Sequence, residues 1–175
     1  MNRNVEVKAR LRGVEQLQYI LSRMCTASPE RVCQRDTFFS VPRGRLKLRE
    51  TDTACELIYY DRSDQSEPAV SEYIILPLED GETHRHLLEA SLGIRGVVSK
   101  NRMVYHLDQT RIHIDEVDGL GLFIELEVVL TPGQSISEGE KEAIRIMNLL
   151  NIRPEDLLPS AYIDLLEKRP TDCLD

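Results

Sequence analysis

Charged side chains occupy every second position in three segments of this chain. Residues 5–12 read VEVKARLR, with charges at the even positions and apolar side chains at the odd ones. The alternation returns in RGRLKLR at 43–49 and, with acidic residues, in FIELEV at 123–128. Clustered Arg and Lys side chains bind the oxygens of phosphate groups, and Glu carboxylates bind divalent cations. Brought together in space, these residues would suit a polyphosphate and its metal ion.

The elements that would position these residues are mainly β-strands, because a period of two places alternate residues on opposite faces of a strand. We predict strands at about 3–12, 29–40, 43–51, 54–62, 69–78, 94–108, 110–118 and 121–131. Apolar stripes with helical spacing predict helices at about 13–25, 82–92 and 137–150, and a last short helix near 159–167. The pair Asp118-Gly119 lies between two alternating runs and indicates a hairpin.

Eight strands are enough to close a sheet on itself. A lipocalin-like barrel would carry apolar residues inside, whereas these strands carry charge. A membrane barrel would show aromatic girdles and no interleaved amphipathic helices, yet this chain has only six Tyr and three Phe. The prediction is therefore an α+β fold, with a closed eight-stranded antiparallel β-barrel, helices packed on the outside and a charged bore.

Length and composition restrict the partners of the protein. The chain has 175 residues, which suits a single domain over 1–175, and a net charge of −8. That charge argues against nucleic acid, whose binding needs a basic surface. No apolar stretch is long enough to span a membrane as a helix and no apolar leader is evident, so we expect a cytoplasmic protein. The four Cys form no CxxC motif, and we expect their thiols to be reduced. The expected partner is a small anionic substrate, without nucleic acid or membrane, and a homodimer remains open.

An ordered series of motifs identifies a family resemblance. The stretch NVEVK at 4–8 matches an ExExK signature in which Asn4 replaces the first Glu. Further matching segments are RLKLR at 45–49, ELIYY at 56–60, KNR at 100–102, RIHID at 111–115, GLG at 119–121, ELE at 125–127 and SAYIDLL at 160–166. Over nearly its whole length the chain resembles the CYTH superfamily, the triphosphate tunnel metalloenzymes named after CyaB adenylyl cyclase and thiamine triphosphatase. The resemblance implies an antiparallel tunnel that binds a triphosphate and one or two divalent cations.

The resemblance also implies roles for individual residues. Lys8 would lie near the scissile phosphate, and Lys8 and Arg49 are the expected catalytic residues. The expected phosphate-binding residues are Lys8, Arg45, Lys47, Arg49, Lys100, Arg102 and Arg111. The expected ligands of Mg²⁺ or Mn²⁺ are Glu6, Asp115, Glu125 and Glu127, since these cations take carboxylate oxygens. His113 shares a strand face with Arg111 and Asp115, and a hydrogen-bonded structural role is favoured there over a general base.

Three functions remain open at this level. The first is a metal-dependent triphosphatase, in which water attacks the terminal phosphorus of inorganic triphosphate, thiamine triphosphate or a nucleoside triphosphate. The alternative is a class IV adenylyl cyclase, in which the ribose 3′-hydroxyl of ATP attacks the α-phosphorus and pyrophosphate leaves. The third is a non-catalytic sensor of polyphosphate or nucleotide, because the neutral Asn4 removes one charge that would bind metal. The triphosphatase ranks first because it demands least beyond the phosphate clamp and the metal.

Overall fold

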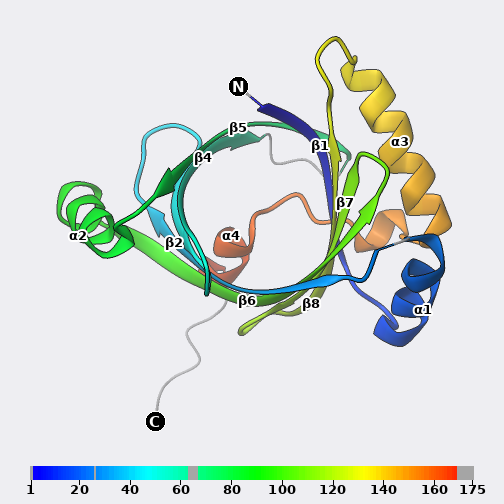
Figure 1. The fold of residues 1–175 in the computed structure, drawn as a ribbon, viewed down its shortest axis with the longest axis horizontal. Coiled ribbons are helices and arrows are strands. Elements are labelled where there is room, and N and C mark those ends of the chain that lie inside the picture. The colour runs from blue at the N-terminus through cyan, green and yellow to red at the C-terminus, as the bar shows by residue number, and fades with distance from the viewer. Residues whose placement is uncertain (1, 26, 63–66, 169–175) are drawn as a thin grey trace.

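The computed structural model describes residues 2–25, 27–62 and 67–168. Its eight antiparallel strands close into a barrel in the order β1-β5-β4-β3-β2-β6-β7-β8 (Figure 1). The strands are β1 (Asn2–Arg10), β2 (Glu30–Phe39), β3 (Arg45–Glu50), β4 (Cys55–Arg62), β5 (Ala69–Leu78), β6 (Ile94–Leu107), β7 (Thr110–Val117) and β8 (Gly121–Val129). The predicted fold class is confirmed, and the predicted strands differ from these only at their ends.

The alternation in β1 shows how the sequence separates the two faces of the barrel wall. Val5 and Val7 are buried against the helices outside the barrel. Glu6 and Lys8, one residue along, line the bore. Because the side-chain period of a strand is two, a shift of one residue would exchange these sets, so the apolar face fixes which charges point inward.

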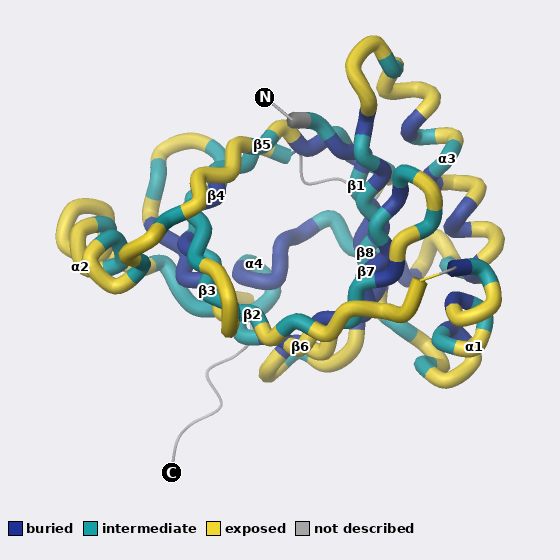
Figure 2. The backbone as a smooth tube through the Cα atoms, viewed as in Figure 1, coloured by how far each residue is buried: buried dark blue, intermediate teal, exposed yellow. Residues whose placement is uncertain are grey.

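Two helices cover the outer wall beside β1, β7 and β8 (Figure 2). Helix α1 (Val14–Met24) contributes Leu21 to this core, and helix α3 (Ile136–Leu149) contributes Ile146. The start of α3 is fixed by a capping box between Ser135 and Glu138. Gly139 lets α3 approach the wall closely, since a Cβ there would lie 2.6 Å from a methyl of Leu130. The burial of this face holds the acidic strands in place.

The last helix occupies a different position from the others. Helix α4 (Tyr162–Glu167) lies across the ring of strands in the view of Figure 1. Tyr162 lines the bore and packs on Phe123 at a centroid distance of 5.0 Å, while Ile163 belongs to the same core cluster. A short 3₁₀ turn at Pro154–Asp156, which the sequence did not predict, precedes this segment. Thus α4 closes the bore at one end and does not cover an outer wall.

Helix α2 (Gly81–Leu92) completes the set, and none of its described residues is buried. Its first turn is capped by Asp80, whose side chain accepts a hydrogen bond from the backbone N–H of Thr83 at 3.0 Å. Within the described part of the chain, no helix combines the length and apolar character needed to cross a bilayer.

Candidate functional site

The bore of the barrel is a cavity of about 370 Å³, a size typical of small-molecule sites. Its lining includes every predicted site residue except Asp115: Glu6, Lys8, Arg45, Lys47, Arg49, Lys100, Arg102, Arg111, Glu125 and Glu127. These residues come from β1, β3, β6, β7 and β8, which the closed barrel brings around one space. The structure therefore collects in one cavity charges that lie more than a hundred residues apart.

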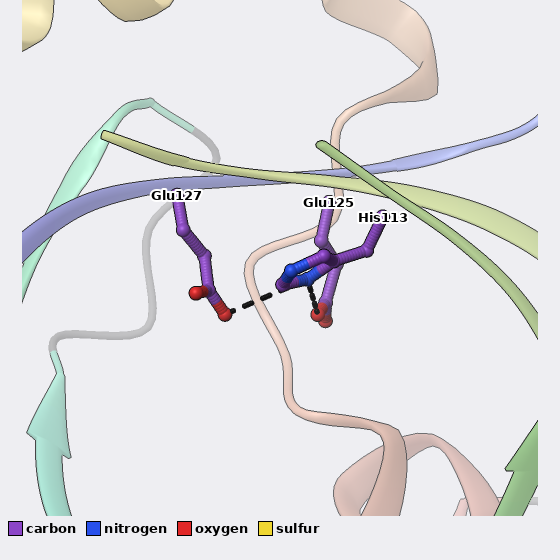
Figure 3. Close-up of side chains that lie close together, drawn as sticks. All are labelled: His113, Glu125 and Glu127. Carbon is purple, nitrogen blue, oxygen red and sulfur yellow. Dashed lines mark ion pairs between the residues drawn. The ribbon is translucent and has the colours of Figure 1, made fainter. Parts of the chain in front are cut away.

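The acidic side of the bore is formed by β7 and β8. Their register pairs His113 with Glu125 and Arg111 with Glu127, so all four side chains project from the face of the sheet that lines the bore. Figure 3 shows the imidazole of His113 between the two carboxylates. Its Nδ1 lies 3.8 Å from Glu125 Oε2 and 3.6 Å from Glu127 Oε1, and the ligand atoms of the three residues lie within 4.8 Å of one another.

Basic side chains form ion pairs with both carboxylates of this acidic group. Glu125 is paired through both oxygens, since Oε1 lies 3.0 Å from Lys8 Nζ and Oε2 lies 2.5 Å from Arg102 Nη2. Glu127 Oε2 lies 2.8 Å from Arg111 Nη2. Lys8 Nζ also sits 3.8 Å from the centre of the Tyr162 ring, a cation–π contact. Lys8 is thus held between the acidic group and the end of the bore closed by α4.

Glu6 lies in the same cavity but outside the group formed by His113, Glu125 and Glu127. Burial raises the pKa of Glu6 to about 7, and the negative charges of Glu127 and Glu125 add to this effect, while Arg62 opposes it. Burial and the two neighbouring carboxylates thus disfavour the charged form of Glu6. A cation bound beside Glu6 would favour that form.

The basic side of the bore depends on Asp36, a buried residue of β2 that sequence reasoning missed. Lys47 Nζ donates to Asp36 Oδ2 at 2.6 Å, and Arg49 Nε and Nη2 donate to its two oxygens at 2.8 Å each. Burial alone would raise the pKa of Asp36, but Lys47 and Arg49 together hold it well below its ordinary value. The only indication in the sequence was that Asp36 lies in a predicted strand, where successive residues point to opposite faces.

The position of Lys47 in the bore makes its ammonium group easier to deprotonate. Burial lowers the pKa of Lys47 to about 8, and the neighbouring Arg49 contributes, although Asp36 acts in the opposite direction. The side chain also lies 5.5 Å from the ring centres of Phe38 and Tyr60. A phosphate placed beside Lys47 would therefore favour its charged form.

Asp115 has partners other than those expected of a metal ligand. It is fully buried and accepts hydrogen bonds from Lys100 Nζ at 2.9 Å, Arg102 Nε at 2.7 Å and the Tyr162 hydroxyl at 3.0 Å. Burial would raise its pKa, but Arg102 and Lys100 lower it overall. The structure does not bring Asp115 into the group with His113 and the two glutamates. Its contacts orient two cations that line the bore.

Arg45 connects the bore to α4. Its Nη2 lies 2.8 Å from Oδ2 of Asp164, whose other oxygen contacts Arg95 at 2.6 Å. Asp164 also accepts a hydrogen bond from the backbone N–H of Ala161, which fixes the first turn of α4. Sequence reasoning identified Arg45 but missed Asp164, because the two residues are 119 positions apart.

The residues present are compatible with a divalent cation. His113, Glu125 and Glu127 offer one nitrogen and several oxygens at close range. Buried His113 Nδ1 has no hydrogen-bond partner among the described residues, and the same holds for other atoms that line this cavity: Asn4 Oδ1, Gln34 Oε1, Arg62 Nε and Arg111 Nε. Buried polar atoms without partners are uncommon in folded proteins, and a cation bound beside the two glutamates would give His113 Nδ1 a partner. The donor set therefore fits the metal that the sequence predicted.

Comparison with known proteins places the chain in a family. The chain is 28% identical over 122 residues to a candidate adenylate cyclase of Methanocaldococcus jannaschii, covering 69% of each protein. The solved PH1012 protein of Pyrococcus horikoshii superposes with a TM-score of 0.82 at 24% identity, over 93% of this chain and 98% of that one. A Hippeastrum protein, described as a candidate adenylyl cyclase with a dominant triphosphatase activity, superposes with a TM-score of 0.65 at 16% identity, over 95% of each chain. The model of the CYTH domain matches residues 2–162, and the chain belongs to the CYTH domain family.

Proposed function

We propose that the bore binds a compound with three linked phosphates and that the protein hydrolyses its terminal phosphoanhydride. The observation on which this rests is the meeting of a basic and an acidic side in one cavity of about 370 Å³. Each kind of charge has a separate task in such a reaction. The basic side binds the phosphate oxygens, and the acidic side holds the cation that accompanies them.

The basic side is organised before any ligand arrives. Asp36 fixes Lys47 and Arg49, and Asp115 fixes Lys100 and Arg102. Fixed guanidinium groups suit the paired oxygens of a phosphate, and a fixed ammonium supplies a compact charge. Because these groups are already oriented, little reorganisation is needed when phosphate charge develops during the reaction.

Glu6, Glu125 and Glu127 are the proposed carboxylate ligands of Mg²⁺ or Mn²⁺. Such a cation, when bound, would neutralise phosphate charge and polarise a phosphorus–oxygen bond. In the proposed hydrolysis, water forms a bond to the terminal phosphorus, and the bond to the bridging oxygen breaks to release orthophosphate. Lys8, held beside Glu125 and Tyr162, stabilises the negative charge that develops on the phosphoryl oxygens.

A class IV adenylyl cyclase is the second candidate, and the relative from Methanocaldococcus jannaschii favours it. There the ribose 3′-hydroxyl would attack the α-phosphorus of ATP, releasing diphosphate and cyclic AMP. The bore also contains the apolar or aromatic side chains of Phe38, Ile58, Tyr60 and Tyr73, which could contact an organic group. Both reactions use the same phosphate clamp.

A panel of substrates separates these functions. Purified protein is incubated with Mg²⁺ or Mn²⁺ and, in turn, inorganic triphosphate, thiamine triphosphate and ATP. Orthophosphate release supports the triphosphatase, whereas cyclic AMP with diphosphate identifies the cyclase. Binding of triphosphate without any product would identify a sensor and overturn both enzymatic proposals.

Substitutions test the assignment of the site. Lys8→Ala, Arg49→Ala and Glu127→Ala should each lower turnover by at least about 100-fold, as loss of fixed charge stabilisation does. The matched controls are Lys141→Ala, Arg31→Ala and Glu116→Ala, which remove exposed side chains of the same types. Near-normal turnover in all three bore variants would contradict the assignment.

A further inference from the structure

His113 has an unusual environment for a structural histidine. Its side chain is 4% exposed, and its Nδ1 has no hydrogen-bond partner among the described residues. The nearest carboxylate oxygens, on Glu125 and Glu127, lie 3.8 and 3.6 Å away, beyond hydrogen-bond length. Leaving a buried ring nitrogen without a partner is unfavourable, so its orientation needs another explanation.

The strand register fixes the face of β7 from which His113 projects. His113 pairs directly with Glu125 across β7 and β8, in the buried centre of both strands. The imidazole then lies between the two carboxylates, as Figure 3 shows. One nitrogen and two carboxylates therefore converge on one point of the cavity.

The same cavity is short of one carboxylate. Asn4 occupies the position of the first Glu of the ExExK motif, and its Oδ1 also lacks a hydrogen-bond partner within the described residues. The amide offers an oxygen but no charge. A nitrogen ligand from β7 would add to the coordination that the remaining carboxylates offer.

We propose that His113 Nδ1 is a direct ligand of the divalent cation held by Glu125 and Glu127, and that it makes this centre prefer Mn²⁺ to Mg²⁺. Mg²⁺ takes oxygen ligands and keeps several waters, so a fixed nitrogen replaces an oxygen that it would favour. Mn²⁺ also suits carboxylates, but as a first-row transition cation it accepts an imidazole nitrogen more readily than Mg²⁺ does. This proposal deepens the proposed function and rests on it for the location of the metal.

The test measures metal binding without any substrate. The full-length protein is titrated with Mn²⁺ and Mg²⁺, and the Mn²⁺ complex is examined by pulsed electron paramagnetic resonance for coupling to ¹⁴N. The wild type should show this coupling, and His113→Gln should lose it. The ratio of Mn²⁺ to Mg²⁺ affinity should fall by at least about tenfold in the variant, since changes to outer-shell partners alone reach that size.

Two further variants keep the test decisive. His106→Gln is the matched control, because His106 lines the same cavity but is half-exposed and faces Glu30. It should retain the ¹⁴N coupling. His113→Asp replaces the nitrogen by carboxylate oxygens, and should bind Mg²⁺ at least as well as the wild type while losing the coupling.

The outcomes distinguish this proposal from the proposed function. A wild-type Mn²⁺ complex without ¹⁴N coupling, a coupling that survives in His113→Gln, or an unchanged affinity ratio would overturn the role of His113, whatever the protein hydrolyses. Conversely, a protein that turns over no triphosphate but shows the coupling would refute the triphosphatase and leave this metal site standing.

Discussion

Replacing Asp36 by Asn tests the buried carboxylate that organises the basic side of the bore. The change preserves shape but removes the charge that accepts three hydrogen bonds from Lys47 and Arg49, at 2.6, 2.8 and 2.8 Å. Loss of one partner from a buried ion pair costs about 3–5 kcal/mol. The side chains of Lys47 and Arg49 are 12 and 17% exposed, so the lower end of the range applies. We expect Asp36→Asn to lower the free energy of unfolding by about 3 kcal/mol.

The dependence on pH provides a second check of the same reasoning. The pKa of Asp36 is lower in the folded protein than in the unfolded chain. The Asp36 carboxylate therefore stabilises the fold fully at pH values above the ordinary Asp pKa of about 3.9. This stabilisation is lost as the pH falls toward the pKa of the folded state. The difference between wild type and Asp36→Asn should therefore narrow below about pH 4. Urea denaturation of both proteins at a series of pH values measures this difference in the free energy of unfolding.

The control is Asp52→Asn, which changes an exposed Asp in the turn between β3 and β4. It should leave the free energy of unfolding within about 0.5 kcal/mol of the wild type. The reasoning would be refuted if Asp36→Asn cost less than about 1 kcal/mol, or if its cost stayed constant from neutral pH into the acid range.

Three further predictions concern other parts of the molecule. Because the pKa of Lys47 is lowered to about 8, the affinity for inorganic triphosphate, measured by calorimetry without metal, should decline as the pH rises through that value. Lys47→Arg should abolish this decline, since Arg stays charged, and a decline unchanged in that variant would exclude Lys47 as its source. Asp164→Asn removes the charged acceptor of Arg45 on α4 and should lower the free energy of unfolding, measured in urea, by about 2 kcal/mol. An unchanged urea midpoint would show that this ion pair does not hold the helix. Gly139→Ala should cost about 1–3 kcal/mol by the same assay, because its Cβ would press on Leu130 at 2.6 Å, and a neutral effect would mean that α3 shifts freely.

The strands and the inward-facing charges could be predicted from sequence because both depend on local alternation. A strand with apolar residues at odd positions, such as Val5 and Val7, must turn its even positions the other way. With the outer face covered by α1 and α3, Glu6 and Lys8 were left for the bore. A closed barrel then brought the separate charged strands around a common space.

The pairing of individual charges could not be predicted in this way. Asp36 meets Arg49 because β2 and β3 pair in one particular register, and alternation within each strand does not specify that register. Asp115 was predicted to bind metal from its type and its family motif, yet its contacts are with Lys100 and Arg102. Which cation each carboxylate meets is decided by the three-dimensional arrangement of the strands.

The closure of the bore by α4 has a consequence for the shape of an acceptable ligand. Under the proposed function, a linear polyphosphate that enters from the opposite opening would meet the ring of Tyr162, which lines the bore. On that proposal, recognition would begin at the terminus of such a chain, while a bulky substituent at the other terminus would stay near the entrance.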